Sequence, residues 1–254
     1  MIANDVSFQL FSSRASDSLD EQLSFLAGLG YTDVQPFFFA PPDDMATVRG
    51  DAERVRKHGL TARSGHFTLD FFEEAGDRLE EIAGLYGMSL VVVPWIAPED
   101  RPETGEGWRE IGRRLSAYRN DAERRGLAFA YHNHDFEMVP LADGSYPLDH
   151  LLGKDVPLEP DLAWMVKANA RPEEWLAKYA GRIPAVHVKD VAPSGECLDE
   201  MGFADVGHGT MDWPRLWERS LAAGAGLMVV EHDKPSDWKR FASRTIEAVR
   251  GFAS

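Results

Sequence analysis

The sequence has little cysteine and lacks any long apolar run. Cys197 is the single cysteine among 254 residues, so a framework of intramolecular disulfides is excluded. One thiol is typical of a protein in a reducing compartment. The apolar run at residues 90–96 is far shorter than the roughly 20 residues that cross a bilayer. Residues 1–5 also lack the basic and then apolar pattern of a signal peptide, so we expect a cytoplasmic protein.

Positive charge is also scarce in this sequence. Lysine and arginine number 27 against 42 aspartates and glutamates, which gives a formal net charge of −15. Such a charge repels phosphate backbones and anionic lipid surfaces, so nucleic acids and membranes are excluded as main partners. A small anionic substrate is still compatible with it, because a bound metal or a few nearby cations can reverse the local field.

Short β-rich segments recur along the chain, and helical segments lie between them. Alternating strands and helices predict parallel strands that are joined by crossovers. Eight such units in a chain of this length fit a closed (β/α)8 TIM barrel. We therefore predict an α/β protein with one TIM-barrel domain over residues 1–254. The predicted strands are 6–11, 33–37, 61–66, 90–95, 127–134, 156–161, 183–190 and 226–233.

Glycine is absent where the competing fold would use it. An open, doubly wound sheet often carries a glycine-rich phosphate loop after its first strand. Here the first predicted strand runs into Phe11-Ser12-Ser13-Arg14. This favours the barrel over the open sheet. No glycine-rich turn enters a helix elsewhere and no arginine cluster follows the late strands, so the sequence does not predict a phosphorylated substrate.

Helix ends are indicated by capping signals. Asp17-Ser18-Leu19-Asp20 resembles a helix start, and Gly59, Gly87 and Gly126 resemble C-caps. After the start at residue 17, further helices are predicted at about 42–58, 70–86, 106–125, 171–180, 213–223 and 236–252, with a short one near 148–152. Two longer loops, 135–155 and 191–212, follow the fifth and seventh strands on the face where barrels keep their chemistry.

Polar side chains gather at the ends of the predicted strands, after apolar interiors. Side chains of a strand alternate between two faces, so residues two apart share a face. The pairs that share a strand face are His132 with His134, Glu159 with Asp161, His187 with Lys189, and Glu231 with Asp233. The third strand adds His66. Each histidine taken alone fits a structural or solvent-exposed role. Burying the whole set without a metal or substrate would cost too much free energy.

Imidazole nitrogen and carboxylate oxygen together suit Mn²⁺, Co²⁺, Fe²⁺, Zn²⁺ or Mg²⁺. We therefore predict one divalent metal ion at the carboxyl ends of the strands.

The ordered set of motifs resembles the sugar phosphate isomerase/epimerase family, whose members have a xylose isomerase-like barrel. The resemblance spans nearly the whole chain. It is carried by residues 30–35, 131–137, 159–164, 187–190, 207–213 and 230–233, among them Tyr131-His132-Asn133-His134-Asp135 and His187-Val188-Lys189-Asp190. It implies a metal-dependent enzyme that acts on a small carbohydrate, and it suggests a homodimer.

The resemblance also implies the metal ligands. The family commonly uses Glu, Asp, His and Glu on its fifth to eighth strands, and the last three correspond to Asp161, His187 and Glu231. The fifth strand of this chain offers histidine instead of glutamate. His132 is taken as the ligand with His134 nearby, although their roles could be exchanged. Two further departures are Gln35, where relatives often have glutamate, and His208, which we expect in solvent.

The implied chemistry is removal of a proton beside a carbonyl that the metal chelates together with a neighbouring hydroxyl, giving an enediolate. Glu159, Glu231 and His134 are the candidate bases. Lys189 is a candidate donor to the developing oxyanion, and its alternative role is a surface salt bridge with Asp190.

Several other residues are candidates for binding the substrate. They are Gln35, His66, Glu137, and the rim aromatics Trp95 and Trp164, for which core packing is the alternative. Phe37, Phe38 and Phe39 could wall the pocket or form a dimer contact.

The leading functional hypothesis is a metal-dependent isomerase or epimerase of a sugar or keto-sugar. The alternative is a lyase or dehydratase that uses the same site on a keto-sugar, a keto-inositol or a 3-oxo-glycoside. A histidine-rich fifth strand resembles the lyase branch, and it puts a simple two-base epimerisation in doubt. An endonuclease IV-type repair enzyme is disfavoured by the charge of −15 and by the small ligand set. The ordered ligand set also disfavours a non-catalytic binding barrel.

Overall fold

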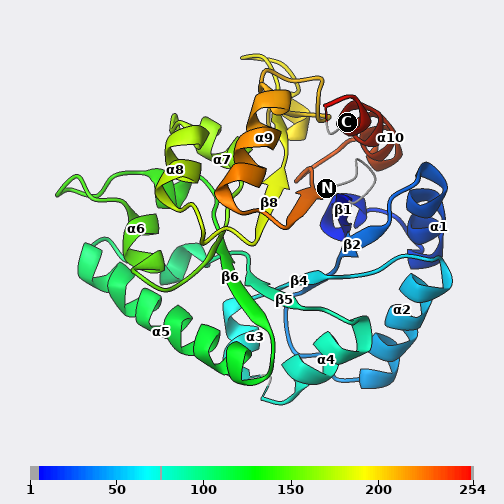
Figure 1. The fold of residues 1–254 in the computed structure, drawn as a ribbon, viewed down its shortest axis with the longest axis horizontal. Helices are drawn as coiled ribbons and strands as arrows, with labels where there is room; N and C mark the ends of the chain where they lie inside the picture. Colours follow the sequence, from blue (N-terminus) through cyan, green and yellow to red (C-terminus); the bar gives the residue numbers. More distant parts are fainter. Residues whose placement is uncertain (1–5, 75, 253–254) are drawn as a thin grey trace.

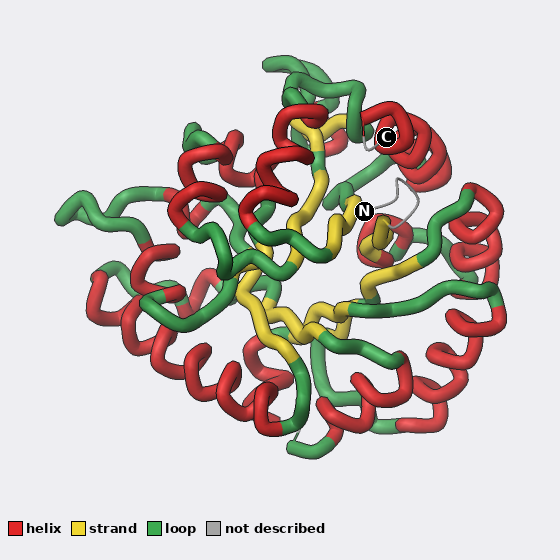
Figure 2. Tube along the Cα trace, in the orientation of Figure 1, coloured by secondary structure: helices red, strands yellow, loops and turns green. Residues whose placement is uncertain are grey.

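The strands form a barrel, and the helices surround it (Figures 1 and 2). The computed structural model describes residues 6–74 and 76–252. Within these residues the strands pair in the orders β2-β1-β11-β8 and β3-β4-β5-β6-β7, and every pairing in these two sheets is parallel. The bridges Asp33↔Thr61 and Asp161↔His187 join the two sheets and close the barrel. The sequence prediction of a TIM barrel is confirmed.

Each predicted strand overlaps an observed barrel strand. The second predicted strand is divided at Pro36, which has no N–H group to donate to the ladder. The strands are β1 (Val6–Gln9), β2 (Asp33–Gln35), β3 (Phe37–Phe38), β4 (Ser64–Phe67), β5 (Leu90–Val93), β6 (Ala128–His132), β7 (Leu158–Glu159), β8 (Ala185–Val188) and β11 (Leu227–Val230).

The helices differ from the prediction at two places. The helix expected at 70–86 is divided into α3 and α4, with Gly76 at a φ of +53° between them. Helix α7 directly follows β7 and was not predicted. The helices are α1 (Leu19–Leu29), α2 (Met45–Lys57), α3 (Leu69–Glu74), α4 (Arg78–Tyr86), α5 (Gly105–Arg124), α6 (Pro147–Leu152), α7 (Leu162–Lys167), α8 (Pro172–Lys178), α9 (Trp213–Ala223) and α10 (Trp238–Phe252).

None of these helices is long and apolar enough to cross a membrane.

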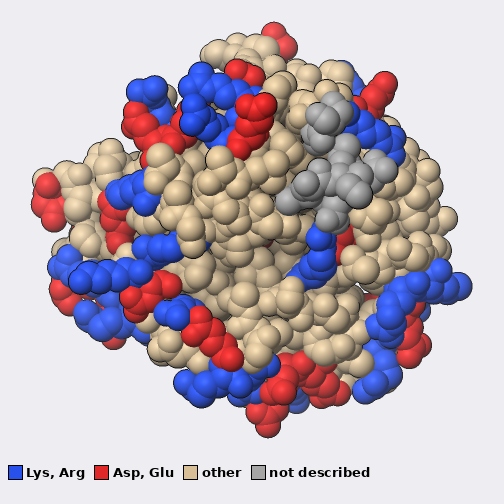
Figure 3. Space-filling view, viewed as in Figure 1, with Lys and Arg blue, Asp and Glu red and all other residues tan. Residues whose placement is uncertain are grey.

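Figure 3 shows that charged side chains of both signs lie mainly toward the rim of one face of the molecule, while the middle of that face is largely uncharged. On this face the excess of acidic residues therefore forms no single patch.

The barrel interior changes from apolar to polar along β6, β8 and β11. Leu90, Val92, Ala130, Ala185, Leu227 and Val229 form a small buried cluster. Because strand side chains alternate, the next inward positions after Ala130, Ala185 and Val229 are His132, His187 and Glu231. The apolar layer thus becomes the floor beneath the polar side chains.

The long segment after β8 is braced by Asp190. This residue starts β9 (Asp190–Val191), which pairs antiparallel with β10 (Phe203–Ala204). Its carboxylate accepts hydrogen bonds from the backbone N–H groups of Val191, Gly207, Gly209 and Met211. The backbone beside Lys189 is thereby fixed, and Trp213 Nε1 donates to the Lys189 carbonyl at 2.9 Å.

Glu200 ties the same segment to the end of the barrel. It lies in the short 3-10 helix Leu198–Glu200 and is almost fully buried. Its carboxylate accepts hydrogen bonds from Ser236 N at 2.6 Å and from Arg240 Nη2 at 2.9 and 3.1 Å. Burial would raise the pKa of Glu200, but these donors outweigh burial and lower the pKa to about 2.

We expect Glu200 to stabilise the fold in a pH-dependent way. Its folded pKa lies below its ordinary value of 4.5, so its contribution is present above pH 4.5 and is lost as the pH falls toward 2. Glu200→Gln should lower the free energy of unfolding by about 1–3 kcal/mol at pH 7, and the difference from wild type should shrink below pH 4. Urea unfolding at several pH values measures both effects.

The exposed neighbour Asp199 provides a matched control. Asp199→Asn should match wild type at every pH. A stability difference for Glu200→Gln that is the same at pH 7 and pH 3 would contradict the expected role of the charge.

Candidate active site

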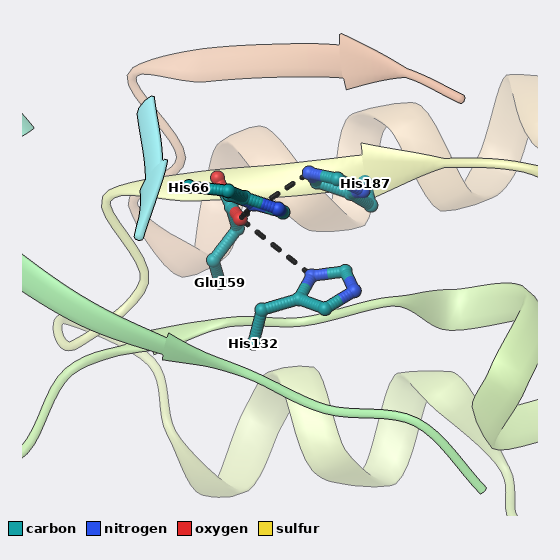
Figure 4. Close-up of side chains that lie close together, drawn as sticks. All are labelled: His66, His132, Glu159 and His187. Atoms are coloured by element: carbon teal, nitrogen blue, oxygen red, sulfur yellow. Dashed lines mark hydrogen bonds and ion pairs between the residues drawn. The ribbon is translucent and has the colours of Figure 1, made fainter. Parts of the chain in front are cut away.

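A buried polar cluster lies where the carboxyl ends of β4, β6, β7, β8 and β11 meet (Figure 4). Its side chains are His66, His132, Glu159, Asp161, His187, Lys189 and Glu231, and each is at most 6% exposed. They come from the inward-facing positions that follow the apolar floor. The sequence placed all of them at strand ends, and the structure brings them together.

Glu159 lies at the centre of the three histidines. Figure 4 shows its carboxylate facing the three imidazoles. Its Oε2 is 2.7 Å from His66 Nε2, 3.2 Å from His187 Nε2 and 3.5 Å from His132 Nδ1. Gln35 Nε2 donates to its Oε1 at 3.0 Å. Burial would raise the pKa of Glu159, but the charges of His187 and His66 outweigh burial and hold the pKa well below its usual range.

His132 and His187 favour opposite charge states, although both are buried and adjacent. Burial and the charge of His187 lower the pKa of His132 to about 4. Burial also opposes the charge on His187, but Glu159 and Glu231 outweigh burial and raise its pKa to about 10. His187 Nδ1 lies 2.8 Å from Glu231 Oε2, and its Nε2 lies 2.9 Å from Gln35 Oε1. Without an ion the cluster therefore contains a neutral and a cationic imidazole at neutral pH, and His187 would lose its proton on binding a metal.

Lys189 points into the cluster rather than toward a surface partner. Its Nζ lies 2.8 Å from Asp161 Oδ2, Glu231 Oε2 and Asp233 Oδ2. Burial would lower the pKa of Lys189, but these three carboxylates outweigh burial and hold the pKa well above its usual range. The ammonium group thus balances part of the acidic charge.

The predicted metal ligands fit a divalent ion. His132, Asp161, His187 and Glu231 each offer one ligand atom, and these atoms lie within 4.8 Å of one another. His132 Nδ1 and Asp161 Oδ2 are buried and have no hydrogen-bond partner in the described part of the chain; the Lys189 contact to Oδ2 is ionic. Such unpaired polar atoms are costly unless a further ligand satisfies them. Their role as metal ligands remains a prediction.

A second group of ligand atoms overlaps the first. His66, His132, Glu159 and His187 also offer atoms within 4.8 Å of one another. Both groups contain His132 and neither contains His134. Between the two fifth-strand histidines, the geometry therefore favours His132 as the ligand.

A cavity of about 350 Å³ opens above the cluster. Among its lining residues are His66, His132, His134, Glu231, Asp233 and Trp95. Burial together with the charges of His132 and Lys189 holds the pKa of His134 well below its usual range, so this imidazole is neutral at pH 7. Of the candidate bases, Glu231 and His134 reach the cavity, whereas Glu159 lies beneath it.

Three predicted substrate contacts are not among the lining residues. Glu137 is buried; it accepts a hydrogen bond from the Tyr131 hydroxyl at 2.5 Å and another from His134 N at 2.9 Å. Burial raises the pKa of Glu137 to about 7. The structure thus gives it a role in holding the end of β6, and its predicted substrate contact stays a prediction.

The other two predicted contacts, Trp164 and Gln35, also have packing or positioning roles. Trp164 is buried, and its ring packs edge-on against Phe203 at 5.0 Å. Gln35 is fully buried and bridges Glu159 and His187 from below. By contrast Trp95 is 40% exposed at the rim, and His208 is exposed as expected.

The sequence reasoning missed Gln9. Its Nε2 donates to Gln35 Oε1 at 2.6 Å, so it helps to orient the amide that contacts Glu159 and His187. A signal was present: Ser7 and Gln9 are polar residues two apart in a strand, on the face that the site residues share.

The sequence model of the xylose isomerase-like TIM barrel matches residues 23–250 of the chain. The chain belongs to this family. Comparison with curated protein sequences gave no match.

Solved structures of xylose isomerase-like barrels resemble the chain over nearly its whole length. A sugar phosphate isomerase/epimerase from Parabacteroides distasonis is 20% identical with a TM-score of 0.80, over 98% of this chain and 95% of that one. A zinc-bound IolI protein is 16% identical with a TM-score of 0.70, over 98% and 96%. The 3-keto-D-glucoside 4-epimerase YcjR from E. coli is 16% identical with a TM-score of 0.68, over 97% and 99%. At these identities the likeness supports the fold.

Proposed function

We propose that this protein is a divalent-metal-dependent isomerase or epimerase that acts on a sugar or keto-sugar through an enediolate. The observation that carries the proposal is the group His132, Asp161, His187 and Glu231, whose ligand atoms lie within 4.8 Å of one another. Two of these residues, His132 and Glu231, also line the cavity, so a bound substrate would lie beside the ion. These four side chains are the proposed ligands.

When bound, a divalent ion supplies Lewis-acid polarisation of a substrate carbonyl. Glu231 is the proposed base that takes the proton from the neighbouring carbon. Burial would raise the pKa of Glu231, but Lys189 and His187 outweigh burial and hold the pKa well below its usual range, so the carboxylate is ionised at neutral pH. His134 lines the same cavity as a neutral imidazole and is the proposed second proton carrier.

The remaining polar residues position these groups. Lys189 is proposed to donate toward the developing oxyanion, since its ammonium is already held between Asp161 and Glu231. Glu159 orients His66 and His187 from beneath the cavity. His66 lies at the cavity wall, where it can hydrogen-bond a substrate hydroxyl.

The functions for which two similar structures are named agree with this class of reaction. One is named a sugar phosphate isomerase/epimerase and another a 3-keto-D-glucoside 4-epimerase. The IolI structure contains zinc, which is compatible with the histidine and carboxylate donors found here. A cytoplasmic location, a single domain over residues 1–254 and a homodimer remain predictions from the sequence.

A lyase or dehydratase on the same site is the second candidate. The specific observation is the fifth strand, where His132 and His134 stand and a carboxylate is lacking. Elimination needs one base and one acid: Glu231 is the proposed base, and the Lys189 ammonium is the proposed donor toward the leaving group. Epimerisation needs proton removal and return on opposite faces of one carbon. Solvent deuterium in recovered substrate together with an isomeric product supports the isomerase, whereas loss of water or an alcohol supports the lyase.

Metal content tests the proposed site directly. Protein purified without chelator should contain about one equivalent of a divalent transition metal by elemental analysis, and His187→Ala and Asp161→Asn should each lose most of it. His187→Ala removes a ligand from the group of four, and Asp161→Asn replaces a carboxylate ligand with a neutral amide. The exposed His208 offers a matched control, and His208→Ala should keep the metal.

Circular dichroism should show that all three variants are folded. The proposed metal dependence would be contradicted by a wild-type protein that holds no metal and cannot be loaded with Mn²⁺, Co²⁺, Fe²⁺, Zn²⁺ or Mg²⁺.

A further inference from the structure

The two sides of the cavity have different chemistry. One side carries the ionisable groups described above. The other is an aromatic wall formed by Phe11, Phe37, Phe38, Phe39 and Trp95. These residues follow or belong to β1, β3 and β5, whereas the ionisable side is supplied mainly by β6 and β11. The cavity is therefore polar at its floor and apolar along one flank.

Three rings of the wall, those of Phe11, Phe37 and Phe39, are held against one another. Phe11 and Phe37 pack edge to face at 5.3 Å, and Phe37 packs on Phe39 at 5.1 Å. Phe38 is anchored by stacking on the buried Phe67 at 4.8 Å. The outer members are open to solvent: Phe39 is 65% exposed and Trp95 is 40% exposed. Clustered exposed aromatics of this kind mark binding surfaces.

The aromatic wall favours binding of a substrate group that is at least partly apolar. A phenylalanine ring has no hydrogen-bond donor or acceptor, so a second sugar could pack only its C–H faces on these rings, and any hydroxyl turned toward them would lose its hydrogen bonds with water. A flat apolar ring would instead gain burial and edge or offset stacking. A cavity of about 350 Å³ is at the lower end for ligand pockets, which fits one sugar-sized group and one small ring but not an oligosaccharide.

We propose that the substrate is an aryl-substituted keto-sugar, such as a 3-oxo aryl glycoside, whose aromatic group packs against the wall formed by Phe11, Phe37, Phe38, Phe39 and Trp95. Its polyhydroxylated end lies on the ionisable floor beside Glu231 and His134. This inference rests on the proposed function and specifies its substrate class. The wall adjoins the reactive groups within one cavity, which favours a substrate group over a second copy of the chain.

Isothermal titration with matched ligands tests the inference. Phenyl and methyl glycosides of glucose, galactose and xylose, in both anomers, differ only in the group offered to the wall. For at least one sugar the phenyl ligand should bind about tenfold tighter or better, which corresponds to about 1.4 kcal/mol. Phe39→Ala and Trp95→Ala should reduce the ratio of phenyl to methyl affinity toward one. Leu198→Ala, which removes a side chain 75% exposed outside the cavity lining, should leave the ratio unchanged.

Equal phenyl and methyl affinities for every sugar, or no binding of either, would overturn the inference. It is also overturned if Phe39→Ala and Trp95→Ala change the sedimentation of the free protein and not the affinity ratio, since the wall is then an interface between copies. Metal content is measured in the same samples. A phenyl preference in a protein that holds no metal would contradict the proposed function and leave the aryl site standing.

Discussion

Replacing Glu231 with glutamine is expected to lower kcat by about 10²- to 10⁴-fold, the usual contribution of a general acid or base. Glu231 is the candidate carboxylate base that lines the cavity, and Lys189 and His187 keep it ionised at neutral pH. The amide keeps the shape of the side chain but cannot take up the proton. Steady-state rates and incorporation of solvent deuterium into the substrate measure the loss.

Glu231 also belongs to the proposed metal-binding group, so the two roles must be separated. Elemental analysis of Glu231→Gln, loaded with the metal that wild type contains, distinguishes loss of the ion from loss of the base. Glu196→Gln, at an exposed position in the loop after β8, is the matched control and should retain wild-type rates. A Glu231→Gln enzyme within tenfold of wild type would assign proton transfer to another residue, and His134 would be tested next.

Replacing Lys189 with methionine is expected to lower the free energy of unfolding by about 3–5 kcal/mol, the range for breaking a buried ion pair. Lys189 is 1% exposed, and its ammonium lies 2.8 Å from three carboxylates. Methionine fills a similar volume but leaves Asp161, Glu231 and Asp233 without their shared cation. Urea unfolding of metal-free protein measures the difference.

Two further variants locate the origin of this loss. Lys154→Met, at an exposed position, should change stability by no more than about 0.5 kcal/mol. Adding Asp161→Asn to Lys189→Met should recover part of the lost stability, because one uncompensated charge is removed. A loss below about 1 kcal/mol for Lys189→Met would show that solvent reaches these carboxylates and that the buried ion cluster does not hold the site together.

The position of the candidate metal ligands could be predicted from local sequence. Residues two apart in a strand share a face, and the carboxyl ends of parallel barrel strands meet at one rim. These two rules place His132, Asp161, His187 and Glu231 near each other without any knowledge of distances, and the structure brings their ligand atoms within 4.8 Å. The eight strand segments followed from the same alternation of strands and helices.

The prediction was weaker where burial or backbone geometry decided the outcome. Glu159 and Glu231 have the same chemistry and similar positions at strand ends. Only the closed barrel places Glu159 under three imidazoles and Glu231 at the cavity. Glu137 follows β6 as a substrate contact would, but its carboxylate instead accepts hydrogen bonds from Tyr131 and a backbone N–H.

The sequence by itself determined the barrel class, the acidic charge and the rim at which the polar side chains gather, because these depend on composition and on the period of two along each strand. The tertiary structure alone decided that Lys189 joins three carboxylates, that Gln9 and Gln35 brace the imidazoles, and that aromatic rings from three separate segments form one wall. These contacts join residues far apart in the chain. Their distances are set by how the barrel closes, and no local pattern encodes that closure.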